Sequence, residues 1–94
     1  MTRESLIQGS ILRYLNSLPG CYAINNHGNS YQGAGRPDIF ASYNGRFLAF
    51  EVKNESGKPT KLQIHELSKW EAAGAVAGIV RSVDDVKKLI EGIE

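Results

Sequence analysis

Asp38, Glu51 and Lys53 have the types and spacing for chemistry, since two carboxylates and an ammonium group flank the ends of one predicted β-hairpin. Two apolar runs surround Asn44-Gly45, a dipeptide typical of two-residue hairpin turns. Such a turn pairs the strands so that Asp38 directly faces Glu51, with Cβ atoms roughly 5 Å apart. Lys53 projects from the same face because it lies two residues beyond Glu51.

Two facing carboxylates repel each other, so the predicted pair needs a compensating partner. Lys53 can neutralise the pair, one carboxylate can hold a proton, or a divalent cation can lie between the two. Mg²⁺ and Mn²⁺ prefer such oxygen ligands, and a lysine beside the ion could orient a water or stabilise charge on a phosphate. Spacing alone leaves open a simpler interpretation, in which the charges form a solvated, salt-bridged hairpin end.

The apolar periodicity predicts a chain of α-β-β-β-α-β-α order, with every element close to this hairpin. The predicted elements are a helix over 3–18, a strand over 21–26, hairpin strands over 37–43 and 46–53, a helix over 60–73, a strand over 75–82 and a helix over 82–93. Both faces of the hairpin are largely apolar, which indicates a sheet covered by helices on both faces.

The run Gly35-Arg36-Pro37-Asp38 and the later Glu51-Val52-Lys53 resemble the PD…(D/E)XK signature of a large nuclease superfamily. With the Gly-Lys loop and a Gln early in the next helix, the sequence looks like the VRR-NUC family. Stand-alone members of that family are small and encoded by viruses or bacteria, and they resemble archaeal Holliday junction resolvases. The resemblance spans nearly the whole chain and implies a restriction-endonuclease-like α/β fold with a central mixed sheet.

The resemblance also implies a Mg²⁺ or Mn²⁺ site and assigns its ligands. Asp38 and Glu51 would bind the ion, with Glu4 from the first helix and the backbone carbonyl of Val52. Lys53 would orient the attacking water or stabilise developing charge. Glu4 lies near the top of the apolar stripe of its helix, but it also suits a first-turn residue that complements the helix dipole.

Gln63 has two interpretations. Thr60 and Gln63 fit a capping box, in which the Gln side chain bonds back to the Thr60 amide. In similar nucleases a Gln here faces the site and supports the lysine or the water, so Gln63 is also a candidate catalytic residue.

Four residues are candidate DNA contacts at phosphates: His27, Arg36, Lys58 and Lys61. His27 lies in a polar, glycine-rich segment and can equally be an ordinary exposed histidine. The Ser56-Gly57-Lys58 run lacks the spacing of a P-loop, so no nucleotide cofactor is expected.

Length and composition predict one domain over residues 1–94 and an ordinary globular protein. The 94 residues are 41% hydrophobic and 22% charged, and the net charge of +1 does not itself indicate a nucleic-acid partner. No apolar run is long enough to span a membrane. A single cysteine predicts a reduced protein, hence a cytoplasmic location, either in a bacterium or in the host cell of a virus.

The expected activity is metal-dependent, structure-selective cutting of DNA, at four-way (Holliday) junctions or other branched DNA. A four-way junction is two-fold symmetric and needs two cuts, so a junction-cutting chain with one site should form a homodimer. Two alternatives stay open: a flap or nonspecific nuclease, and a module that binds branched DNA or a protein without cutting.

Overall fold

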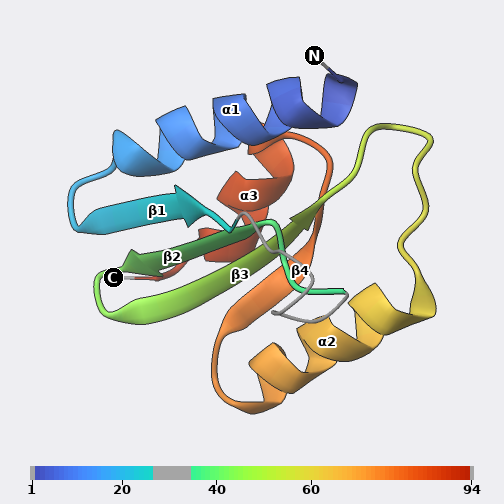
Figure 1. The fold of residues 1–94 in the computed structure, drawn as a ribbon. Helices are drawn as coiled ribbons and strands as arrows, with labels where there is room; N and C mark the ends of the chain where they lie inside the picture. The colour runs from blue at the N-terminus through green and yellow to red at the C-terminus, as the bar shows by residue number, and fades with distance from the viewer. Residues whose placement is uncertain (1, 27–34, 94) are drawn as a thin grey trace.

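The computed structural model describes residues 2–26 and 35–93 and has the predicted element order (Figure 1). The elements are α1 (Arg3–Asn16), β1 (Cys21–Asn25), β2 (Ile39–Tyr43), β3 (Arg46–Val52), α2 (Lys61–Ala72), β4 (Val76–Val80) and α3 (Val83–Ile90). Each element lies where the sequence predicts it, and the observed ends are up to three residues shorter. Predicted ends are longer because side-chain periodicity continues into turns that no longer have helical or strand hydrogen bonds.

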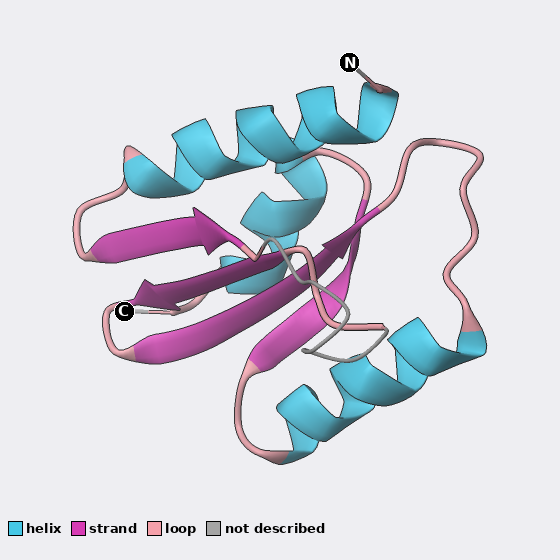
Figure 2. Cartoon of the chain, viewed as in Figure 1, coloured by secondary structure: helices cyan, strands magenta, loops and turns pink. Residues whose placement is uncertain are grey.

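The four strands form one mixed sheet in the order β1-β2-β3-β4 (Figure 2). The first three strands are antiparallel to one another, whereas β4 runs parallel to β3 at one edge. The chain crosses from β3 to β4 through α2. Because β3 and β4 are parallel, their C-terminal residues Val52 and Val80 lie side by side at one end of the sheet.

The hairpin has the predicted register. Tyr43 pairs with Arg46 and Ile39 pairs with Phe50. Asn44 and Gly45 have φ of 51° and 84°, the pair of positive values that a tight two-residue hairpin turn requires. Asp38 directly precedes β2, so this register carries it to the position facing Glu51.

The main core lies between the sheet and the pair α1 and α3, which cover the same face (Figure 1). Alternate residues of the hairpin point into this core, as the period of two predicts. The fully buried side chains include Ile11, Leu15, Ile39, Leu48, Phe50, Val52, Val80 and Val86. Because Ile39 and Phe50 point to this core, Asp38 and Glu51 belong to the opposite face.

Among the described residues, α2 covers the opposite face over β3 and β4 and reaches β2 at Phe40. Trp70 of α2 packs on Phe40 and Phe47, with ring centroids 5.1 and 5.2 Å away. On β1, Tyr22 is 73% exposed and Ile24 is 46% exposed. The prediction that helices cover both faces is therefore correct for the hairpin and β4, while this face of β1 stays open.

Within residues 2–26 and 35–93, no helix is both long enough and apolar enough to cross a bilayer.

Candidate active site

The end of β3 and the start of β2 bring Asp38 and Glu51 together on the α2 side of the sheet. The backbone N–H of Val52 donates to Asp38 Oδ2 at 2.9 Å, which fixes the aspartate against the end of β3. The two carboxyl groups lie close enough to share a hydrogen bond when one of them is protonated. The facing arrangement derived from the turn is thus present.

Glu51 is buried, and its two carboxylate oxygens have different surroundings. Oε2 accepts a hydrogen bond from Nε2 of Gln63 at 2.9 Å and lies 3.7 Å from Nζ of Lys53. Oε1 is buried and has no hydrogen-bond partner among the described residues. A buried, unsatisfied carboxylate oxygen is costly, so this oxygen calls for a proton or a cation.

The electrostatics of Glu51 confirm that Lys53 does not fully compensate the pair. Burial raises the pKa of Glu51 most, and the nearby Asp38 raises it further, while Lys53 lowers it. The sum brings the pKa of Glu51 to about 8. Without an added cation, the protonated form of the Glu51 carboxyl group is therefore favoured at neutral pH. Of the three ways to stabilise the pair, neutralisation by Lys53 alone is insufficient.

The donor set at this site suits a hard divalent cation. Asp38 and Glu51 offer carboxylate oxygens, one of them an orphaned buried atom, and such ions keep several of their own waters. Glu4 lies in the first turn of α1, which covers the opposite face, and it has the smallest effect on the pKa of Glu51. Across the described part of the chain, no three acidic, histidine or cysteine side chains are clustered for metal binding. The structure therefore does not bring Glu4 together with Asp38 and Glu51 as a third ligand, and its role in metal binding stays a prediction.

Gln63 forms the predicted capping box and also contacts a carboxylate of the site, while its catalytic role stays a prediction. Its backbone N–H donates to Oγ1 of Thr60 at 3.1 Å, and its Oε1 accepts from the Thr60 backbone N–H at 2.9 Å. The remaining amide nitrogen is the group that donates to Glu51. The capping box and the site contact are therefore compatible, because they use opposite ends of one amide.

The Gly35-Arg36-Pro37-Asp38 run is anchored along its length. Gly35 has φ of 82° and lies so close to α2 that a Cβ there would come within 2.8 Å of Leu62 Cγ, so only glycine fits. Pro37 is buried. Asn26 holds the backbone beside it, since its N–H donates to the Asp38 carbonyl at 2.7 Å and its amide to the Pro37 carbonyl at 3.1 Å.

Arg36 is engaged by the protein itself. Its Nη1 lies 2.7 Å from Oε2 of Glu66, a buried carboxylate on α2 that also accepts from Nε1 of Trp70 at 3.1 Å. Burial raises the pKa of Glu66, but the hydrogen bond and charge of Arg36, with smaller effects of Lys69 and Trp70, together outweigh burial and lower it. Arg36 therefore ties the segment before β2 to α2.

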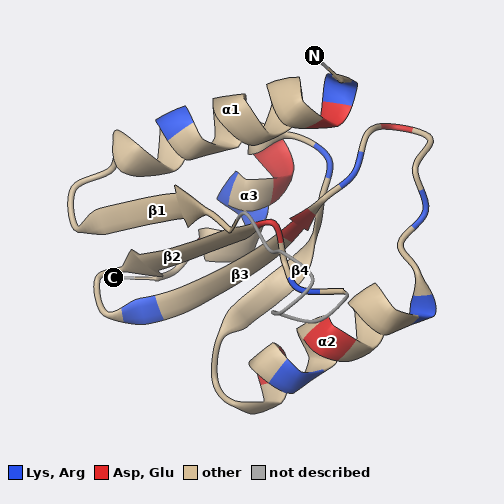
Figure 3. Cartoon of the chain, viewed as in Figure 1, with Lys and Arg blue, Asp and Glu red and all other residues tan. Residues whose placement is uncertain are grey.

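The other candidate DNA contacts lie near the same end of the sheet. Lys58 and Lys61 are exposed, in the loop after β3 and in the first turn of α2. Figure 3 shows basic residues along this loop, next to the acidic end of β3. His27 lies outside the described residues.

Three supporting residues escaped the sequence analysis: Asn26, Glu66 and Arg81, whose Nη1 donates to the backbone carbonyls of Asn54 and Gly57 in the loop after β3. Each acts through a partner that is distant in sequence, such as the 30 positions that separate Arg36 from Glu66. Glu66 alone carried a usable signal, because it lies four residues before Trp70 and so on the same helical face.

No family model and no curated protein matches the sequence. Among solved structures, one described as "VRR_NUC domain" aligns over 100% of both chains with a TM-score of 0.80 and 27% identity. Another, described as "VRR_NUC domain protein", covers 97% of this chain and 87% of its own, with a TM-score of 0.69 and 16% identity.

Over residues 2–26 and 35–93, an open four-stranded mixed sheet and three helices form an α/β fold, and the match to a VRR_NUC domain implies a nuclease-type domain. The full-length match to a structure described as a VRR_NUC domain, together with the PD…EXK residues at the ends of β2 and β3, supports a VRR-NUC domain assignment.

Proposed function

We propose that this domain is a Mg²⁺- or Mn²⁺-dependent endodeoxyribonuclease that cuts phosphodiesters in branched DNA, with four-way junctions as its preferred substrate. One observation carries the proposal: beside half-buried Asp38, the buried Glu51 retains an unsatisfied carboxylate oxygen even with Lys53 close to it. A purely structural ion pair would have balanced charges, whereas here two carboxyl groups lie beside one lysine.

Asp38 and Glu51 would hold the ion, with the Val52 carbonyl and Glu4 completing the protein ligands. When bound, the ion supplies Lewis acidity toward the phosphate and lowers the pKa of a water. Lys53, whose side chain is 13% exposed, orients the attacking water or offsets charge that develops on the phosphate. Gln63 keeps the Glu51 carboxylate in place.

Lys58 and Lys61 are proposed to contact DNA phosphates, with His27 and Arg36 as further contacts. Both lysines are exposed, in the loop after β3 and in the first turn of α2. Contacts of this kind position a backbone without reading bases, which suits selection by DNA shape.

A homodimer is proposed because a two-fold junction needs two cuts and each chain has one such site. An exposed apolar surface supports self-association. A shallow apolar cleft of about 200 Å³ is lined by Tyr22, Ile24, Phe40, Ala41, Ser42 and Phe47.

The test incubates the purified protein with matched junction, flap, duplex and single-stranded DNA, each with Mg²⁺, Mn²⁺ or EDTA. Nicking of the junction with either metal and none in EDTA is expected, with loss in Asp38→Asn and Glu51→Gln. Glu71→Gln, an exposed carboxylate on α2, is the matched control and should cut normally. Light scattering reports the oligomeric state.

Other outcomes choose between the alternatives. Equal cutting of duplex or flap would replace junction selectivity with a broader nuclease. Junction binding without any metal-dependent nicking would leave a non-catalytic DNA-binding module.

A further inference from the structure

The loop that follows Lys53 is held at two backbone carbonyls by one side chain, Arg81. Nη1 of Arg81 donates to the carbonyls of Asn54 and Gly57, each at 2.6 Å. Arg81 is half-buried and lies directly after the last residue of β4. Hydrogen bonds from a charged donor are short and strong, so this contact fixes the loop to the end of β4.

Within the loop, an Asn-based turn places Gly57 against Lys53. Oδ1 of Asn54 accepts from the backbone N–H groups of Ser56 and Gly57, at 3.1 and 2.7 Å. A Cβ built on Gly57 would lie 3.5 Å from Cδ and 3.6 Å from Cβ of Lys53. The backbone at Gly57 therefore lies beside the methylene groups of the Lys53 side chain.

The same strand end also holds the main chain of Lys53. The Lys53 backbone N–H donates to the carbonyl of Val80 at 3.1 Å, and Val80 directly precedes Arg81. The end of β4 thus positions Lys53 in two ways. Val80 binds the Lys53 backbone directly, and Arg81 holds the loop that packs along the Lys53 side chain.

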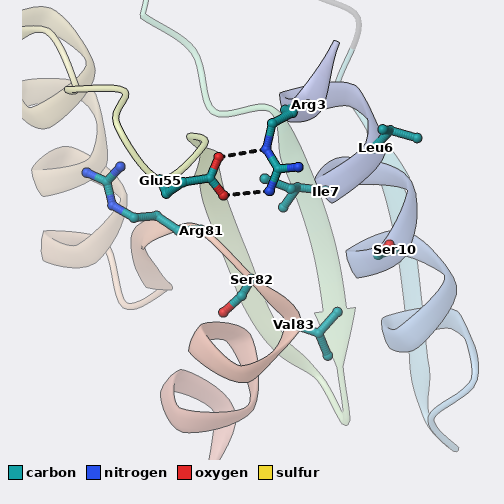
Figure 4. Close-up of a pocket in the computed structure, with 8 residues that line it drawn as sticks. All are labelled: Arg3, Leu6, Ile7, Ser10, Glu55, Arg81, Ser82 and Val83. Atoms are coloured by element: carbon teal, nitrogen blue, oxygen red, sulfur yellow. Dashed lines mark hydrogen bonds and ion pairs between the residues drawn. The ribbon is translucent and has the colours of Figure 1, made fainter. Parts of the chain in front are cut away.

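A second tether on this loop is much weaker. Glu55 forms a bidentate ion pair with Arg3 of α1, with both distances 2.6 Å. Their side chains are 65% and 66% exposed, so solvent and salt screen the pair. Figure 4 shows this pair and Arg81 on the walls of one cleft, whose volume is about 440 Å³.

We propose that Arg81 is a positioning residue for Lys53: it fixes the 54–57 loop so that Gly57 keeps the lysine aimed at the carboxylate pair. The inference rests on the proposed function, since it supposes that the lysine works on the scissile phosphate. In the described part of the chain, the Arg81 side chain donates to the carbonyls of Asn54 and Gly57, so removing it should affect turnover more than metal or DNA binding.

The test compares Arg81→Ala with Arg46→Ala. Arg46 is a matched control, because its Nε also donates to a backbone carbonyl, that of Gly74, at the far end of β3. In Arg81→Ala, kcat for junction nicking should fall about tenfold to 100-fold with KM and Mn²⁺ affinity within about twofold. Exchange of the Ser56 and Gly57 amides should accelerate about tenfold, and the NMR signal of Lys53 Cε should shift. Arg46→Ala should change none of these.

Arg81→Lys keeps a donor cation and should restore part of the kcat, so it decides the matter if Arg81→Ala does not fold. A wild-type kcat in an Arg81 variant with accelerated loop exchange would overturn the inference, as would unchanged exchange. If the wild-type protein cuts none of the DNA substrates, the proposed function fails. The exchange rates and the Lys53 signal then still decide whether Arg81 positions the lysine.

Discussion

Nε2 of Gln63 donates to Oε2 of Glu51 at 2.9 Å, while Oε1 of the same side chain caps the start of α2 at the Thr60 amide. In the cap, the Gln63 side-chain oxygen accepts from the Thr60 backbone N–H, so the amide nitrogen of Gln63 faces the Glu51 carboxylate. The first turn of α2 is thereby tied to the last residues of β3. Helix capping and the geometry of the site therefore depend on one side chain.

Two substitutions separate the contact of Gln63 with Glu51 from its part in capping α2. Thr60→Ala removes the hydroxyl cap and should lower the free energy of unfolding by about 1 kcal/mol, with nicking retained. Gln63→Ala also removes the donor to the buried Glu51 and should both destabilise the protein and slow nicking. Urea unfolding and single-turnover cleavage measure the two effects. Equal cleavage by the two variants would contradict the site role of Gln63.

The raised pKa of Glu51 gives the metal-free protein a specific pH dependence. Between the ordinary pKa of 4.5 and about 8, the folded state holds a proton that the unfolded state has lost. The contribution of Glu51 to the free energy of unfolding is therefore fully present below about pH 4.5 and is lost as the pH rises through about 8. Urea unfolding in EDTA at constant ionic strength should show this decline.

Added Mn²⁺ should reverse that decline because it favours the ionised pair. The rise in Tm with Mn²⁺ should thus be larger at about pH 8.5 than at about pH 5.5. A rise that is equal at both pH values would argue against ion binding at this pair.

Glu51→Gln should stabilise the metal-free protein while removing its activity. The substitution keeps an oxygen for the Gln63 amide and removes a buried charge beside Asp38. At about pH 8.5 in EDTA, we expect Tm to rise, with each kcal/mol worth roughly 4–8 °C, and the effect of Mn²⁺ to disappear. The control is Glu66→Gln, which removes a buried carboxylate that has a cationic partner and should lower Tm. A lower Tm for Glu51→Gln would contradict the electrostatic account.

Lys53→Ala should reduce the rate of nicking by about 10²- to 10³-fold, because the variant lacks the positive charge that offsets charge on the phosphate. Mn²⁺ affinity should change much less, since the lysine is not an expected ligand. Single-turnover cleavage with saturating Mn²⁺ measures the effect, and Lys88→Ala, which replaces an exposed lysine on α3, serves as the control. Full activity in Lys53→Ala would remove the lysine from the mechanism.

The hairpin could be predicted from sequence because one local rule determines it. A two-residue turn at Asn44-Gly45 sets the register of both strands, and that register alone places Asp38 opposite Glu51. The capping box predicted the start of α2 for the same reason, since its partners are three residues apart. Local chemistry therefore predicted the hairpin register, which brings Asp38 to Glu51, and the start of α2.

The surroundings of the site could not be predicted, because they depend on packing between distant segments. Sequence spacing gives no sign that Arg81 reaches Asn54, 27 positions away, or that Asn26 holds the backbone at Asp38. The raised pKa of Glu51 likewise follows from burial under α2, which a pattern of charges does not reveal.

Arg36 and Lys58 should behave differently when replaced by alanine, although the sequence suggests a phosphate contact for both. Arg36→Ala leaves the buried Glu66 without its closest cation, so it should lower the free energy of unfolding by about 1–2 kcal/mol, less than a fully buried pair because Arg36 is partly exposed. Lys58 is exposed, so Lys58→Ala should leave stability unchanged, weaken junction binding and reduce its salt dependence. Urea unfolding and binding in Ca²⁺ at several salt concentrations separate these effects. If Arg36→Ala weakened binding as much as Lys58→Ala without destabilising the protein, Arg36 would be a DNA contact, and its bond to Glu66 would be secondary.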